Sequence, residues 1–202
     1  GTAKYIHCDV SNQEQVKDLI ELSNKTFGPV KLAVNNAGIL GGSKPVGEMD
    51  LDDWHRLIDT NLNGVAYGLR YQIPAILAAG GGAIVNTSSC WGIHPGPDHP
   101  VYSRSKAAVA SLTRCLGRDH AHQNIRVNAV CPNEVNTPMI RSGFEIRGLD
   151  PDKAVAELNA SVPLGRIAEP EDIADVVAFL ASDDARYMCG ALVEVNGGKP
   201  VG

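Results

Sequence analysis

Short apolar runs alternate with longer segments of helical spacing along this chain of 202 residues. The runs predict five strands, at Ala3–Val10, Val30–Val34, Ala83–Thr87, Ile125–Val130 and Ala191–Val195. Strands that are apolar on both faces, and that alternate with helices, are typical of a parallel sheet covered on both sides. The pattern therefore predicts an α/β fold with a doubly wound parallel sheet.

Sequence signals mark where several of the helices begin. Ser11 to Glu14 has the form of a capping box, and Asp50 is placed to cap a second helix. In Glu169-Pro170 the proline occupies a position that a first helical turn accepts. The segment from Tyr102 to about Ala121 is rich in alanine and leucine and predicts another helix. No repeat or low-complexity tract interrupts this alternation, so we expect one domain over residues 1–202.

Composition narrows the possible functions. With 44% hydrophobic and 20% charged residues and a net charge of −5, the chain has the balance of a soluble protein. Its scattered basic residues form no nucleic-acid footprint, and no apolar run approaches the ~20 residues that span a bilayer. The five cysteines are widely spaced, which favours reduced thiols in the cytoplasm. The histidines show no metal-ligand spacing, so we expect no metal site.

Polar residues gather directly after three of the predicted strands. Asn35–Gly38 follows the second strand, Asn86–Ser89 the third and Cys131–Thr137 the fourth. Any one of these clusters alone is explained by an ordinary turn that ends a strand. In a parallel sheet, however, ligands bind beyond the carboxyl ends of the strands. Three such clusters at one edge predict a ligand site there.

Tyr102 and Lys106 are four residues apart, so both side chains lie on one face of their predicted helix. A free tyrosine has a pKa of about 10, too high for efficient proton exchange at neutral pH. A neighbouring ammonium favours the phenolate, so we expect Lys106 to lower the pKa of Tyr102. This spacing is common by chance, and its surroundings must decide whether the two residues form an acid–base pair.

The surroundings supply that context. The order and spacing of several motifs resemble those of the single-domain short-chain dehydrogenase/reductases, namely Asn35-Asn36-Ala37-Gly38, Asn61, Ser89, Tyr102-x-x-x-Lys106 and Asn196-Gly197-Gly198. The step of thirteen residues from Ser89 to Tyr102 is similar to the family's step from catalytic serine to catalytic tyrosine. The similarity extends from Asp9 to Gly198. It implies a Rossmann-like fold and a nicotinamide-dependent oxidoreductase.

The resemblance implies catalytic roles for four residues. Tyr102 exchanges a proton with the substrate, Ser89 hydrogen-bonds the substrate oxygen, and Lys106 also binds the nicotinamide ribose. Asn61 resembles the asparagine whose kinked helix holds a proton-relay water, and an ordinary buried polar residue is its alternative interpretation. Ser88, next to Ser89, is expected to be structural.

The same resemblance implies NAD or NADP as the cofactor. It assigns the contacts as follows: Asp9 and Val10 at the adenine, Asn35, Ala37 and Gly38 at the adenosine half, Tyr102 and Lys106 at the ribose, and Pro132, Val135 and Thr137 at the nicotinamide. For Asp9, a cap of the following helix is the alternative. The family's usual Pro-Gly is Pro132-Asn133 in this chain. Because asparagine tolerates positive φ, we expect that turn to survive.

About fifty residues precede the equivalent of Asp9 in the family, including a glycine-rich turn that binds the pyrophosphate. The resemblance therefore implies that an N-terminal βαβα portion is missing and that the dinucleotide-binding domain is incomplete. The residue that selects NAD or NADP belongs to that portion, so this choice stays open.

Hydride transfer between a secondary alcohol and its ketone is the activity that the resemblance implies, with a small alcohol, diol or polyol as substrate. A 3-ketoacyl (carrier-protein) reductase and a non-catalytic relative that binds a partner remain alternatives. We expect the substrate pocket to be lined by Cys90, Trp91, His94, the loop Pro95–Pro100 and a mobile segment, Met139–Val162. Neither a nucleic acid nor a membrane is an expected partner.

The family's assembly implies a homotetramer. Helices around Asp52–Leu77 and Tyr102–Ala121 would pair with their copies in a second subunit, and Val193–Gly202 would supply the other contact. Small residues such as Ala107 and Ser111 favour a close approach of the second helix to its copy.

Overall fold

A computed structural model describes residues 1–42, 44–97 and 99–199 of the chain. The described residues form one parallel sheet of four strands in the order β1-β2-β3-β4. These strands are β1 (Leu32–Asn35), β2 (Gly82–Thr87), β3 (Ile125–Pro132) and β4 (Leu192–Val195). Four predicted strands are therefore confirmed, with ends that differ by at most two residues.

The predicted strand Ala3–Val10 is wrong, because the structure has no regular secondary structure at residues 1–9. A strand needs a neighbour to satisfy its backbone N–H and C=O groups. In the described part of the chain, β1 is the edge of the sheet and pairs with β2 alone. An apolar run without a pairing partner cannot become a strand.

Helices fill the segments between the strands, and those that follow Asp50 and Glu169 start where the sequence predicts. They are α1 (Gln13–Phe27), α2 (Leu51–Ile58), α3 (Gly64–Ala78), α4 (Cys90–Ile93), α5 (Pro100–His120), α6 (Pro138–Ile146), α7 (Pro151–Ser161) and α8 (Pro170–Ala181). Asp50 caps α2, as predicted, through a hydrogen bond from Asp52 N of 2.9 Å. The capping box at Ser11 is wrong, since Asn12 accepts the bonds that begin α1.

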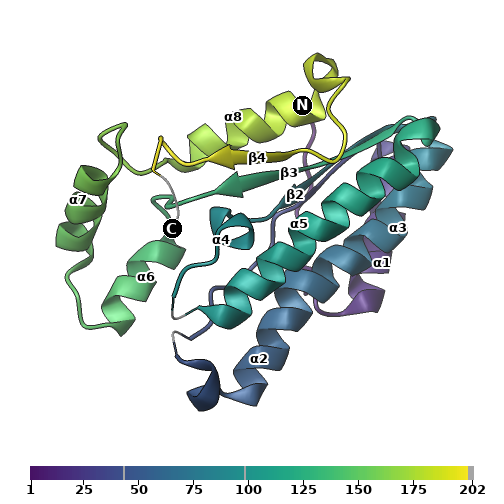
Figure 1. Cartoon of the computed structure of the whole chain (residues 1–202). Coiled ribbons are helices and arrows are strands. Elements are labelled where there is room, and N and C mark those ends of the chain that lie inside the picture. Colours follow the sequence, from purple (N-terminus) through teal and green to yellow (C-terminus); the bar gives the residue numbers. More distant parts are fainter. Residues whose placement is uncertain (43, 98, 200–202) are drawn as a thin grey trace.

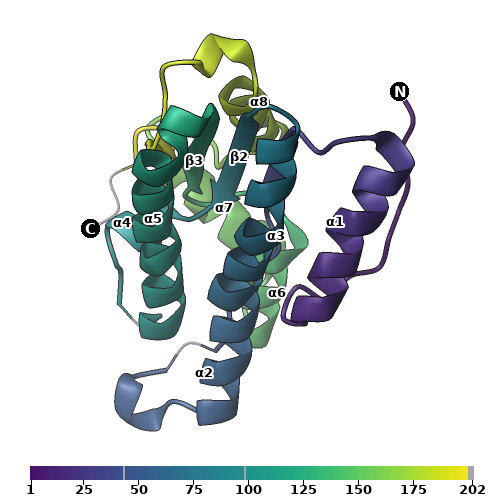
Figure 2. The same ribbon diagram turned by 90° about the vertical axis from the view of Figure 1, so that its right-hand side faces the viewer.

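The sheet separates two apolar clusters because successive side chains of a strand point to opposite faces. Ile84 of β2 packs with Leu69 and Val109 under α3 and α5. Its neighbour Val85 packs with Leu180 of α8 on the other face. Figure 1 shows α8 and α5 on opposite sides of β3 and β4, so the sheet is doubly wound. Figure 2 shows α1 beside α3, at the side away from α5.

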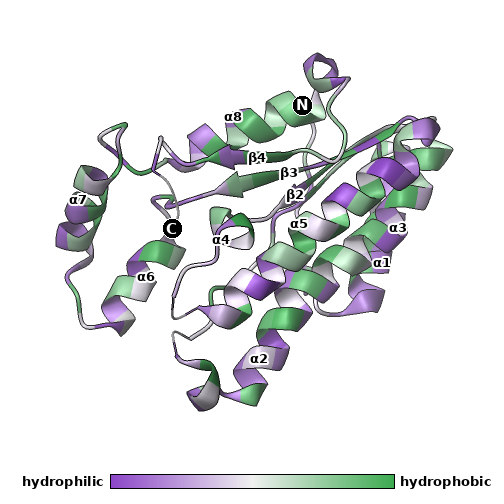
Figure 3. Ribbon diagram, viewed as in Figure 1, coloured by the Kyte–Doolittle hydropathy of each residue, from purple (hydrophilic) through white to green (hydrophobic). Residues whose placement is uncertain are grey.

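The carboxyl ends of the strands point toward α6 and α7 (Figure 1). These helices share a small cluster of their own around Phe144, Val155 and Val162. In Figure 3, the helices carry alternating hydrophilic and hydrophobic bands. None of the helices in the described part of the chain is long and apolar enough to cross a membrane.

Candidate active site

Ser89 lies directly beyond the carboxyl end of β2 and begins α4. Its hydroxyl accepts a hydrogen bond of 3.1 Å from Trp91 N and lies 3.5 Å from the carbonyl oxygen of Pro132. The neighbouring Ser88 donates a bond of 2.8 Å to the backbone carbonyl of Lys106. Ser88 thus ties the end of β2 to α5, in agreement with the structural role expected for it.

Tyr102 and Lys106 face this serine from α5. The Lys106 ammonium donates a hydrogen bond of 2.9 Å to the carbonyl oxygen of Thr87 and lies 5.9 Å from the centre of the Tyr102 ring. The lysine is only 4% exposed, whereas Tyr102 is partly accessible. The structure therefore gathers a hydroxyl, a phenol and a buried ammonium at one strand end.

The pKa shifts of the pair differ from the sequence expectation. Burial raises the pKa of Tyr102, and a hydrogen bond with Ser89 opposes that rise. Lys106 was expected to lower this pKa, but its ammonium is directed to Thr87 rather than to the phenol. Burial also lowers the pKa of Lys106 to about 8, because a charged group loses its hydration there.

Asn61 is fully buried in a π-helical turn, Asp59–Asn63, that joins α2 to α3. Its oxygen accepts a bond of 2.8 Å from Ile39 N, and its nitrogen donates to the Ile39 carbonyl at 2.9 Å. The same nitrogen lies 3.2 Å from the hydroxyl of Ser105. The expected irregularity of the helix at Asn61 is present. Ser105, which the sequence analysis did not single out, links Asn61 to α5.

Two glycines allow the elements of the site to approach one another. A Cβ at Gly38 would lie 3.3 Å from both Asn61 Oδ1 and Lys106 Nζ, so these two polar groups converge on one point. A Cβ at Gly92 would lie 2.7 Å from the carbonyl carbon of Lys106 and 2.9 Å from Ser88 Oγ. Glycine at both positions brings the turn after β1 and the helix α4 into direct contact with the lysine.

The residues expected at the nicotinamide follow β3. Val135 forms an isolated parallel bridge with Ala168, and the Thr137 hydroxyl donates to the Val135 carbonyl at 3.3 Å. The expected left-handed turn at Asn133 is wrong. Among the non-glycine residues that the structure describes, positive φ occurs at Asn124 and not at Asn133. Asn133 instead continues the sheet, since its N–H donates to the Val195 carbonyl at 3.1 Å. Pro132 ends β3 directly before it.

The residues expected at the adenine and at the adenosine half do not all lie together, since Gly38 faces Lys106. Val10, Asn35 and Ala37 line one cavity of about 120 Å³. Asp9 accepts hydrogen bonds from the N–H and the hydroxyl of Ser11, which hold the pKa of its carboxyl below its usual value. These bonds close the turn that precedes α1, whose N-cap is Asn12 rather than Asp9.

The donor groups fit a nicotinamide dinucleotide. An ammonium has three N–H donors, and the described residues engage Lys106 Nζ in one hydrogen bond, to Thr87. Its remaining donors suit the neutral hydroxyls of a ribose. The absent side chain of Gly38 keeps the approach to this ammonium open.

Comparisons with known proteins decide the family. The family model described as Enoyl-(Acyl carrier protein) reductase matches residues 1–199. The cyclohexanol dehydrogenase of Acinetobacter sp. (strain SE19) is 40% identical over 197 residues, which cover 98% of this chain and 74% of that protein. The chain belongs to the short-chain dehydrogenase/reductase family.

Solved structures agree with this assignment. The ligand-free aldohexose dehydrogenase of Thermoplasma acidophilum is 38% identical, with a TM-score of 0.91 over 98% of this chain and 79% of that one. An NAD+-bound xylitol dehydrogenase is 31% identical, with a TM-score of 0.87 over 95% of this chain and 77% of that one. As a short-chain dehydrogenase/reductase, the protein is an NAD(P)-dependent oxidoreductase with a Rossmann-like fold.

Several residues expected to line the substrate pocket contact one another or a neighbouring strand. The rings of Trp91 and His99 meet edge to face at 5.0 Å. His94 lies 3.4 Å from the carboxylate of Glu194, a residue on β4 that the sequence analysis did not identify. The segment expected to be mobile, Met139–Val162, contains most of α6 and all of α7.

Replacement of Gly92 by alanine tests whether the close packing of α4 on α5 holds Ser89 in place. The added Cβ meets backbone atoms of Lys106, which cannot move aside as a flexible side chain does. We expect turnover to fall roughly 10- to 100-fold and the free energy of unfolding to fall by about 1–3 kcal/mol. Steady-state kinetics and urea unfolding measure both quantities.

Gly47→Ala is the matched control, because no atom lies within 4 Å of a Cβ at Gly47. Equal turnover in Gly92→Ala and Gly47→Ala would show that this contact does not position the serine.

Proposed function

We propose that the protein oxidises a secondary alcohol to its ketone, and catalyses the reverse reaction, with NAD or NADP. The observation that carries this proposal is the grouping of Ser89, Tyr102 and Lys106 at the carboxyl end of β2. The cofactor, when bound, accepts the hydride from the substrate carbon. The protein positions the alcohol and handles its proton.

Each group has one task in this proposal. In ketone reduction the protonated phenol of Tyr102 gives its proton to the substrate oxygen, and in alcohol oxidation the phenolate takes that proton back. Ser89 donates a hydrogen bond to the same oxygen in both directions. Lys106 holds the ribose hydroxyls from its buried position. Asn61 and Lys106 both face Gly38, and a water bound between their side chains would carry the proton to and from the phenol.

A small cyclic or polyhydroxy alcohol is the substrate class that we propose. The curated relative at 40% identity is named for cyclohexanol, and the two solved relatives are named for an aldohexose and for xylitol. Trp91 and His99 offer aromatic contacts for a ring, and His94 offers a polar contact. We propose NAD as the first cofactor to test, because the xylitol dehydrogenase binds NAD+. We also propose that the protein is located in the cytoplasm.

Tyr102→Phe tests the proposed chemistry, because it keeps the ring and deletes the transferable proton. Oxidation of cyclohexanol by the protein expressed from its complete gene should slow by about 10²–10⁴-fold, the effect of losing a general acid or base. Tyr187→Phe is the control, since Tyr187 is fully exposed. Near-normal turnover in a folded Tyr102→Phe variant would contradict the assignment of Tyr102 as the proton-transferring residue. If the wild-type protein reduces 3-ketoacyl thioesters but not cyclic ketones, the proposed substrate class is wrong and the substrate is a 3-ketoacyl thioester.

We also propose a homotetramer, whose first interface is the outer face of α5. Ala107 and Ser111 are exposed on that face, whereas Ala110 is buried in the protein's own core. Small exposed side chains let two helices approach closely about a twofold axis. Part of the expected second contact, residues 200–202, lies outside the described residues.

Replacement of Ser111 by arginine tests this interface. A long charged side chain at the helix contact should dissociate the tetramer, whereas Arg118→Lys, a change of similar exposure near the end of α5, should leave it intact. Sedimentation velocity at micromolar concentration measures the assembly. A wild-type monomer, or a tetramer that tolerates Ser111→Arg, would contradict the proposal.

A further inference from the structure

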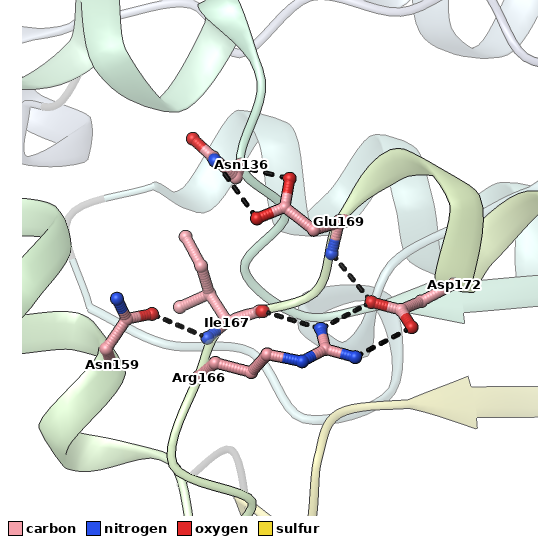
Figure 4. Close-up of polar contacts among 6 residues, drawn as sticks. All are labelled: Asn136, Asn159, Arg166, Ile167, Glu169 and Asp172. Carbon is pink, nitrogen blue, oxygen red and sulfur yellow. Dashed lines mark hydrogen bonds and ion pairs between the residues drawn. The ribbon is translucent and has the colours of Figure 1, made fainter.

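Asn136 lies between Val135 and Thr137, two of the residues expected at the nicotinamide, and its side chain points toward Glu169 (Figure 4). Its amide nitrogen lies 3.1 Å and 3.2 Å from the two carboxylate oxygens of Glu169. Its amide oxygen accepts a bond of 3.2 Å from Arg141 of α6. The side chain therefore bonds simultaneously to the start of α8 and to α6, which belongs mostly to the segment expected to line the substrate pocket.

The backbone of Asn136 is fixed to the same region. Its N–H donates to the Ala168 carbonyl at 2.8 Å, and the Ala168 N–H donates to the Glu134 carbonyl at 3.1 Å. This pairing is the parallel bridge between Val135 and Ala168. The backbone of Glu134 to Asn136 is thus paired with Ala168, in the segment that leads into α8.

Charged groups hold the segment that leads into α8 in place (Figure 4). Glu169 N donates to Asp172 at 2.7 Å, and Arg166 binds both oxygens of Asp172, at 2.5 Å and 2.9 Å. These bonds lower the pKa of Asp172 to about 2, so its carboxylate stays charged at working pH. Ile167 N donates to Asn159 of α7 at 2.8 Å.

We propose that Asn136 is a positioning residue, whose bond to Glu169 holds the Val135–Thr137 segment in place for the nicotinamide half of the cofactor. The inference rests on the proposed function. Exposed polar bonds of this kind add little to folding stability. These bonds instead fix the position of the segment, because Val135 and Thr137 flank a side chain that is bonded to both α6 and the start of α8.

Two ligands separate this role from a general structural one. ADP-ribose contains the adenosine, pyrophosphate and ribose of NAD+ but lacks the nicotinamide. In the protein expressed from its complete gene, Asn136→Ala should weaken NAD+ binding roughly three- to tenfold, the effect of one hydrogen bond. ADP-ribose binding should stay unchanged. Calorimetry measures both affinities, with the 2′-phosphorylated ligands used if the wild type prefers them.

Gln123→Ala is the matched control, since Gln123 is a similarly accessible amide that bonds His120 at the other end of the sheet. Exchanging the amide and the carboxylate between positions 136 and 169 should restore NAD+ binding. Asn136→Asp alone places a second carboxylate against Glu169 and should weaken NAD+ binding. Adding Glu169→Gln supplies an amide donor to that new carboxylate, while Arg141 keeps its acceptor, so NAD+ affinity should return.

The outcomes are distinct. A wild-type protein that binds neither ligand overturns the proposed function and this inference together. Wild-type binding of both ligands, with an Asn136→Ala variant that binds NAD+ normally, overturns the inference alone. An equal loss for NAD+ and ADP-ribose, or a reversed pair that fails to recover, overturns it as well.

Discussion

The site depends on one buried ammonium group. Lys106 is almost completely excluded from water, and a buried charge is tolerated only where other groups hydrogen-bond it. Its partner is the Thr87 carbonyl at the end of β2. The Lys106 backbone carbonyl in turn accepts from Ser88, and Gly92 packs against it. The position of Ser89 beside Tyr102 therefore follows from how this lysine is satisfied.

This arrangement costs stability. Burial lowers the pKa of Lys106 from 10.5 to about 8, which corresponds to roughly 3 kcal/mol. Below pH 8 the lysine is charged in both folded and unfolded states, and the folded state bears the whole cost. As the pH rises from 8 to 10.5, the folded state releases its proton first, so the stability increases. A functional site that is unfavourable for folding is a common compromise in enzymes.

The sequence predicted what periodicity and local signals control. Apolar runs located four strands, and the four-residue spacing placed Tyr102 and Lys106 on one helix face. The sequence-based predictions were wrong where a residue's structure depends on neighbours that are distant along the chain. Residues 3–10 look like a strand but have no partner, and the lysine ammonium turns to a backbone carbonyl rather than to the phenol. Asn136 stood out only as a member of the polar cluster Cys131–Thr137, because its own importance comes from Glu169, which lies 33 residues away.

The most direct measurement is the pKa of Lys106 in the folded protein. Nuclear magnetic resonance of nitrogen-labelled lysine side chains follows this titration, and a Lys106→Met variant assigns the signal. The structure predicts a pKa of about 8. A value at or above the ordinary 10.5 would contradict the account, because Lys106 would then be hydrated or ion-paired instead of buried against Thr87.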